Sequence, residues 1–253
     1  MLEFINPMSL TWSVWTITLS IAFLAGLSKS GMKGAIMLGI PVLAVLYGAR
    51  ESTGILLPFL IMGDLLAIRF YWKHAQWRHV VRLLPWAVVG VLVAVFVGKY
   101  LDDALFRVCM ASILLMSVVL ILWNDVRKRD NNLLQHPRVL PLFGLLGGFA
   151  TMIGNLAGPV FSLYLLTLKL PKKEFIGTGA MFYLTLNFFK IPFHVWSWKT
   201  ISLPSAQMNL VMLPALLLGF FVGSRIVRLI PESAYRYFVL IVTFISAFTL
   251  YFK

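Results

Sequence analysis

Ten apolar segments, most of them close to 20 residues long, follow one another along this 253-residue chain. Runs of about 20 apolar residues match the hydrocarbon core of a bilayer, and helices satisfy their own backbone polar groups there. The segments lie at about 10–28, 34–48, 53–72, 80–98, 104–123, 139–153, 157–169, 175–196, 205–226 and 233–252. We therefore expect an all-α, polytopic integral membrane protein with about 8–10 helical segments.

The chain repeats its own pattern after a shift of 123 residues. The matches are Gly31 with Gly154, Asp64 with Asn187, and Arg50-Glu51-x-x-Gly54 with Lys173-Glu174-x-x-Gly177. Two tandem copies in an apolar chain are a common signature of secondary transporters, which bind substrate between the repeats. We expect a first membrane repeat at 1–124, a basic linker at 125–138 and a second repeat at 139–253.

Basic residues are distributed unequally between the two sides, if every segment changes sides. Sixteen lysines and arginines then share the side of the linker, which contains Arg127 to Arg129, against six on the other side. This excess predicts a cytoplasmic linker and outside termini. Five segments in each half is an odd number, so the repeats are predicted to be inverted, with a pseudo-two-fold axis in the membrane plane.

Two equivalent segments, 34–48 and 157–169, are short. They hold ~15 and ~13 residues, below the ~17–25 that a crossing helix needs. Each follows a polar break that contains glycine, at 28–34 and 151–159. Paired short, interrupted segments are a pointer to a transporter binding site. The pattern predicts broken or re-entrant hairpins, and leaves open whether the short segments cross.

Hydrogen-bond donors lie at both breaks, and the first break also contains Lys29 and Lys33. A half-helix N-terminus carries partial positive charge and binds anions. The candidate substrate-binding residues are Ser28, Lys29, Ser30, Gly31, Lys33, Thr151, Gly154 and Asn155. Two alternatives stay open: the small residues only pack helices closely, or Lys29 and Lys33 are cytoplasmic anchors.

Asp64 stands alone as a charge in the core of the third apolar segment. A carboxylate there costs about 2.5–3.5 kcal/mol on insertion scales and often marks an ion or proton path. Its repeat partner Asn187 is neutral, and Lys190 lies one turn further on. These three are the intramembrane polar candidates. Asp64 carries a coupling proton, pairs with a lysine such as Lys29, or is an interfacial carboxylate close to Arg69.

Glu51 and Glu174 stand just ahead of apolar helices, where acids complement the helix N-terminus, so we expect them to cap these helices. His194 lies in an aromatic stretch typical of a membrane interface, and we expect it to be packed.

Catalytic and metal-binding motifs are missing. There is no Walker loop, no Gly-x-Ser-x-Gly and no His-Glu-x-x-His, so we expect no enzyme and no catalytic residues. Only nine acidic residues are present and they are scattered, so we expect no metal and no cofactor. The net charge of +13 does not indicate nucleic acid, because the basic residues segregate to one membrane side. The expected partners are the lipid bilayer and a small anion.

Three motifs resemble the TauE/SafE family of bacterial sulfite and organosulfonate exporters: 25–34 (AGLSKSGMKG), 147–159 (GGFATMIGNLAGP) and 173–180 (KEFIGTGA). The similarity covers essentially the whole chain. It implies an inner-membrane secondary transporter that exports a small anion such as sulfite or sulfoacetate by alternating access, with proton coupling as an option. Asn155 and Leu156 depart from the usual glycine-rich motif, which leaves the substrate open. An anion channel and a non-transporting assembly subunit remain alternatives, and a second copy of the chain, forming a homodimer, is one of the partners to be considered.

Overall fold

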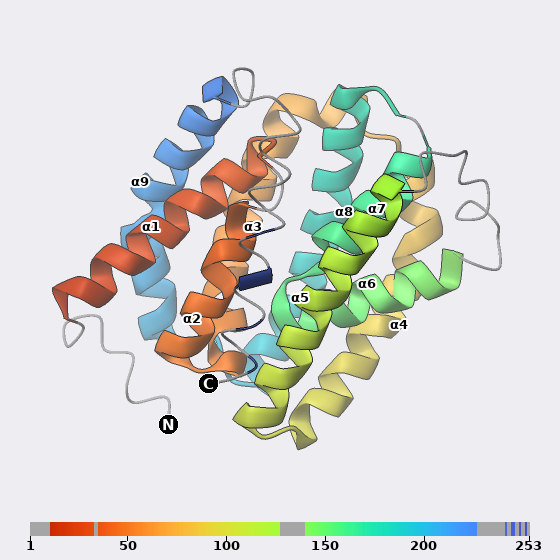
Figure 1. Cartoon of the computed structure of the whole chain (residues 1–253). Coiled ribbons are helices and arrows are strands. Elements are labelled where there is room, and N and C mark those ends of the chain that lie inside the picture. The colour runs from red at the N-terminus through yellow and green to blue at the C-terminus, as the bar shows by residue number, and fades with distance from the viewer. Residues whose placement is uncertain are drawn as a thin grey trace.

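The regular elements of the structure, a computed structural model, are helices throughout the residues that it describes. These residues are 11–32, 35–126, 140–168 and 170–226, with 241, 244, 245, 248 and 251. The helices are α1 (Trp12–Lys29), η3 (Ala35–Leu38), α2 (Gly39–Tyr47), α3 (Ala49–Tyr71), η4 (Trp72–His74), α4 (Trp77–Tyr100), α5 (Asp103–Val126), α6 (Leu140–Gly154), α7 (Ala157–Thr167), α8 (Lys172–Pro192), η6 (Phe193–Ser197) and α9 (Leu203–Ile226). The predicted all-α class is confirmed. Lys33, most of the linker and most of the last predicted segment lie outside the described residues (Figure 1).

Helix length separates spanning helices from short ones. In the described part of the chain, three helical stretches are long and apolar enough to cross a membrane, namely Ala49–His74, Trp77–Tyr100 and Leu203–Ile226. By contrast, α2 has 9 residues and α7 has 11. At 1.5 Å per residue these extend only ~14 and ~17 Å, about half of the ~30 Å hydrocarbon core. Both segments predicted to be short are therefore too short to cross as single straight helices.

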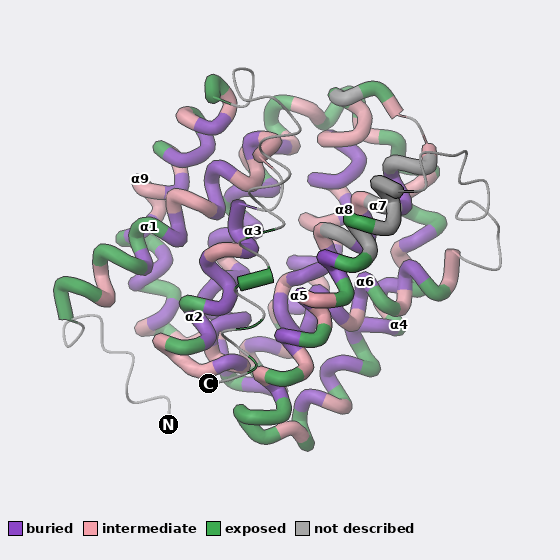
Figure 2. The backbone as a smooth tube through the Cα atoms, in the orientation of Figure 1, coloured by how far each residue is buried: buried purple, intermediate pink, exposed green. Residues whose placement is uncertain are grey.

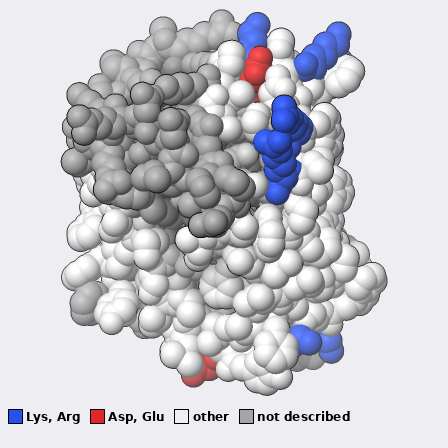
Figure 3. All heavy atoms as spheres, turned by 90° about the vertical axis from the view of Figure 1, so that its right-hand side faces the viewer, with Lys and Arg blue, Asp and Glu red and all other residues white. Residues whose placement is uncertain are grey.

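Apolar side chains cover the outside of the helix bundle. Exposed examples lie on α4 and α9, among them Val93, Phe96, Leu210 and Phe221, and Figure 2 shows such exposed positions on the outward faces of the helices. In Figure 3, the charged side chains that are coloured gather toward the two ends of the molecule, with a broad uncharged band between them. A soluble monomer rarely exposes so much contiguous apolar surface. The molecule is a multi-pass membrane protein.

The helices of the two halves pack against one another in matching pairs. α1 lies against α9, α4 against α6, and α3 against α8. The first helix of each half therefore packs on the fourth helix of the other half. A Cβ added to Gly26 would lie 2.0 Å from the carbonyl oxygen of Leu216, and one on Gly148 would lie 1.9 Å from that of Ala87. Small residues are needed at both crossings because the backbones approach so closely.

The repeated glycines Gly54 and Gly177 also make matching contacts. A Cβ on Gly54 would lie 2.5 Å from the carbonyl oxygen of Thr200, shortly after α8. A Cβ on Gly177 would lie 2.5 Å from the carbonyl oxygen of Tyr71, at the end of α3. Each end of the α3–α8 pair is thus closed by one glycine, and this pair carries the polar centre of the molecule.

Sharp turns separate the short helices from their neighbours. Gly48 ends α2 with a φ of +95°, a conformation that glycine adopts readily, and α3 begins at the next residue. Glu51 and Glu174 lie in the first turns of α3 and α8, where their charge complements the helix N-terminus. Neither is the N-cap residue, so they act through charge rather than as caps.

Candidate functional site

The centre of the α3–α8 pair is a contact between two repeat equivalents. The side-chain nitrogen of Asn187 donates to Oδ2 of Asp64 at 2.8 Å, and both side chains are buried. The two residues lie 123 positions apart, one in each half of the chain. This hydrogen bond therefore marks a place where α3 of the first half meets α8 of the second half.

Lys29, the last residue of α1, joins Asp64 and Asn187, and we call these three residues the first-half cluster. Its Nζ donates to Oδ1 of Asp64 at 2.6 Å, and the Lys29 side chain is 14% exposed. The ring of Tyr183 lies with its centroid 5.0 Å from the same nitrogen, within cation–π range. The tip of α1 thus carries its lysine inward. Of the roles left open for Asp64, pairing with Lys29 is the one that the geometry shows.

Lys190 forms the second-half cluster and is fully buried on α8. It lies three residues after Asn187, on the same helix face. Its Nζ donates to the carbonyl oxygen of Thr151 at 3.0 Å, to the hydroxyl of Thr151 at 3.0 Å and to Oδ1 of Asn155 at 2.7 Å. Three acceptors match the three protons of an ammonium group. None of them is a carboxylate, and neither of the two ion pairs formed by the described residues includes Lys190.

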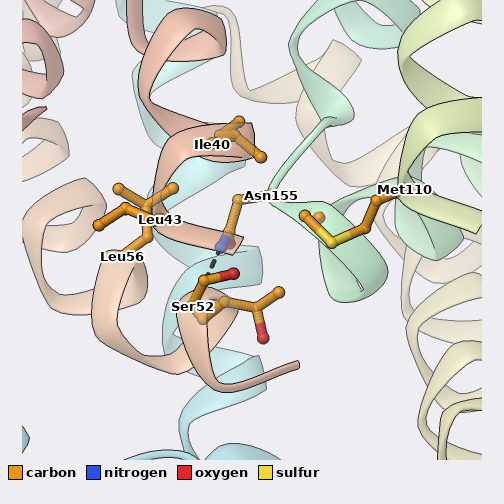
Figure 4. A pocket seen from close by; sticks show the side chains of 8 residues that line it. Ile40, Leu43, Ser52, Leu56, Met110 and Asn155 are labelled. Carbon is orange, nitrogen blue, oxygen red and sulfur yellow. Dashed lines mark hydrogen bonds between the residues drawn. The ribbon is translucent and has the colours of Figure 1, made fainter. Parts of the chain in front are cut away.

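Asn155 holds the break between α6 and α7. Its φ is +57°, in the left-handed region where asparagine is one of the few tolerated side chains. Its amide nitrogen donates to the carbonyl oxygen of Thr53 at 3.1 Å, the dashed line in Figure 4. In the first half, Gly31 makes the matching turn after α1 with a φ of +123°. Asn155 therefore ties Lys190 on α8 to the first turns of α3.

We call α1 with α2 the first hairpin and α6 with α7 the second hairpin. A small hollow lies beside Asn155, between α2 of the first hairpin and the α6–α7 break of the second (Figure 4). It is lined by Ile40, Leu43, Ser52, Thr53, Leu56, Met110, Gly154 and Asn155. Its empty volume is about 140 Å³, but no part of it is wide enough to hold a water molecule. An anion can therefore occupy this place only if its walls move apart.

The candidate residues separate into those that meet and those that do not. The polar clusters contain Lys29, Asp64, Asn187, Lys190, Thr151 and Asn155, and Gly154 lines the hollow. Ser30 is buried but donates to the carbonyl oxygen of Leu27 in its own turn, Ser28 is half-buried, and Lys33 lies outside the described residues.

Sequence reasoning did not single out two members of the site. Tyr183 lies over Lys29 and donates its hydroxyl to the carbonyl oxygen of Gly158 at 3.3 Å. Thr53 contributes a backbone carbonyl to Asn155. A tyrosine in an apolar helix and a main-chain oxygen carry no signal that a residue pattern reveals, so only the packing identifies them.

Residues 18–250 match the family described as Sulfite exporter TauE/SafE. The match includes both polar clusters and both short helices. No curated protein and no solved structure matches the chain.

Proposed function

Because the chain belongs to the sulfite exporter TauE/SafE family of non-enzymatic membrane transporters, we propose that it exports sulfite or an organosulfonate such as sulfoacetate. The family implies a small anion as the transported substrate and a protein embedded in the bilayer. The finer assignment, a sulfur oxyanion moved outward across a bacterial inner membrane, is the proposal.

Lys190 is the observation that carries this proposal. It is fully buried in the middle of an apolar protein, and its three acceptors are neutral. A buried ammonium without a carboxylate is costly, and an anion of opposite charge offsets that cost. Charged groups inside membrane proteins commonly mark ion and substrate pathways for this reason. The cation lies where the α6–α7 break meets α8, beside the hollow.

Alternating access about this centre is the mechanism we favour. The pairing of α1 with α9 and of α4 with α6 supports inverted repeats with an axis near the Asp64–Asn187 contact. Rocking one half against the other would alternately loosen the two ends of the α3–α8 pair. The Gly54 contact would open in one state and the Gly177 contact in the other. The hollow, too narrow for water, fits a closed state better than an open pore. In the bilayer, we place both termini outside and the Arg127–Arg129 linker in the cytoplasm, from the distribution of basic residues.

Asp64 is the candidate for proton coupling. In its ionised form it holds Lys29 at the tip of α1 through an ion pair and accepts from Asn187. Protonation would remove the ion pair and free Lys29, which links a proton to the position of the first hairpin. A pH gradient across liposomes should then drive anion efflux in the wild type and fail to drive it in Asp64→Asn.

Flux from purified protein in liposomes tests the function itself. We expect sulfite and organosulfonates to cross the liposome membrane. Truncating one partner of a buried charge pair lowers affinity by more than tenfold, so at limiting substrate Lys190→Met should lower the flux by at least about tenfold. Lys99→Met is the matched control, because Lys99 is exposed near the end of α4. Normal flux in Lys190→Met would contradict the proposal. Single-channel currents would instead indicate a channel, and flux that needs a soluble partner would indicate a subunit.

A further inference from the structure

We infer that the site selects oxyanions with a single negative charge over those with two, and that Lys190 is the group that holds the anion. This inference rests on the proposed anion transport and narrows its substrate class. Hydrogensulfite and simple alkylsulfonates carry one charge, whereas sulfate, the sulfite dianion and sulfoacetate carry two. Among the proposed substrates, the inference therefore favours hydrogensulfite and simple alkylsulfonates and disfavours sulfoacetate.

The buried charges of the described interior leave one positive charge. Lys29 and Asp64 cancel, since they form an ion pair at 2.6 Å. Asn187, Thr151 and Asn155 are neutral, which leaves the ammonium of Lys190. The guanidinium of Arg50 is not part of these clusters, because it is only half-buried and donates to the carbonyl oxygens of Gly98 and Leu101 at the end of α4.

One positive charge matches one negative charge. A singly charged anion at Lys190 makes the whole cluster neutral, so no net charge stays buried. A doubly charged anion of the same size leaves one negative charge in the apolar interior, where an unpaired ion is strongly disfavoured. The same arithmetic holds whether Asp64 is paired with Lys29 or only close to it.

Lys190 is better placed to bind an anion than Lys29. An anion at Lys29 would compete with the carboxylate of Asp64, which is tethered at 2.6 Å. An anion at Lys190 displaces only neutral acceptors, Thr151 and the amide oxygen of Asn155. Charge-assisted hydrogen bonds are the stronger ones, so an anionic oxygen can replace a neutral amide oxygen favourably.

Displacing Asn155 also connects binding to movement. Asn155 sits at the α6–α7 break with a left-handed backbone and reaches across to Thr53 at the start of α3. An anion that takes the place of Asn155 on Lys190 removes one of the two side-chain hydrogen bonds of Asn155. The wall of the hollow formed by Gly154 and Asn155 then loses its side-chain hydrogen bond to α8 and keeps the one to α3. The empty and the loaded site therefore differ in how firmly the second hairpin is fixed.

Methanesulfonate and sulfate are the probes, because they have nearly the same size and differ by one charge. We expect the purified full chain to bind methanesulfonate at least about tenfold more tightly than sulfate, measured by ligand-induced thermal stabilisation and by counterflow of labelled anion in liposomes. Two near-isosteric variants change the buried charge by one unit each. Asp64→Asn raises it and should shift the preference about tenfold toward sulfate, whereas Asn187→Asp lowers it and should weaken methanesulfonate binding.

The wild-type ratio alone keeps the inference testable if a variant fails to fold. Sulfate bound as tightly as methanesulfonate overturns it, as does an unchanged ratio in a folded Asp64→Asn protein. If the protein transports sulfite but does not prefer singly charged anions, the transport proposal survives and the inferred charge selectivity fails. If no oxyanion binds or crosses at all, both fail.

Discussion

Each half of the molecule contributes one lysine to the polar centre, but the two lysines have different partners. In the first half, Lys29 stands on the hairpin and is neutralised by Asp64 on α3. In the second half, Lys190 stands on α8, and the hairpin residues Thr151 and Asn155 give it only neutral acceptors. The same scaffold therefore holds one compensated charge and one uncompensated charge. The first stabilises the fold, and we propose that the second is kept for the substrate.

The two lysines differ in charge compensation but not in mechanical role. Each of them connects a hairpin to a long helix. Lys29 joins the end of α1 to α3, and Lys190 joins α8 to the α6–α7 break. The difference between the halves thus concerns compensation and not mechanical connection. Variants that remove one feature while keeping the other separate these two roles.

Removing Lys29 should have the largest effect on stability. Lys29→Met leaves the fully buried carboxylate of Asp64 with Asn187 as its remaining hydrogen-bond partner. Breaking a buried pair in this way costs about 3–5 kcal/mol of unfolding free energy. Thermal and denaturant unfolding in detergent measure it. The double variant Lys29→Met/Asp64→Asn should recover most of the loss, and a single variant within about 1 kcal/mol of the wild type would show that the pair is not structural.

The closing contacts of α3 and α8 should respond alike in the two halves. Gly54→Ala and Gly177→Ala each bring a Cβ within 2.5 Å of a carbonyl oxygen. Overpacking of this kind costs about 1–3 kcal/mol. The control is Gly158→Ala, where the nearest atom, Cε of Met37, would lie 3.9 Å away, so no loss is expected. A strong loss in one repeat and none in the other would break the equivalence of the halves.

Thr151 should show the smallest effect. Thr151→Val removes one of three acceptors of Lys190 and leaves the carbonyl oxygen of the same residue in place. The net loss of one hydrogen bond is about 0.5–1.5 kcal/mol. Thr185→Val is the control, because the Thr185 hydroxyl bonds only to the carbonyl oxygen of Met181 within its own helix. Equal stability losses in the two variants would show that the hydroxyl of Thr151 contributes nothing specific to Lys190.

The helices were predictable where apolar length decides them. The segments expected at 53–72, 80–98 and 205–226 correspond to α3, α4 and α9, and both short segments are short in the structure. His194 is buried, as expected for a packed histidine. The π-helical turn that carries it, η6, was not predicted, because it follows from local packing after Pro192 and not from periodicity.

The site was predictable only in part. A lone carboxylate in an apolar segment is conspicuous, so Asp64 and a lysine partner could be named from the sequence. The partners of Lys190 lie 39 and 35 residues away on another helix and its break, and no spacing rule connects them. The sequence also left open that Lys29 is a cytoplasmic anchor, because a lysine beside a polar break looks like part of a loop. The tip of α1 instead turns its lysine onto Asp64.

Methanesulfonate binding to two variants tests the central claim most directly. Lys190→Met removes the uncompensated charge, whereas Lys29→Met/Asp64→Asn removes the compensated pair and leaves Lys190 in place. We predict that the dissociation constant rises by at least about tenfold in the first and by less than about threefold in the second. The opposite result, loss of binding in the double variant and normal binding without Lys190, would contradict the account and place the anion at Lys29.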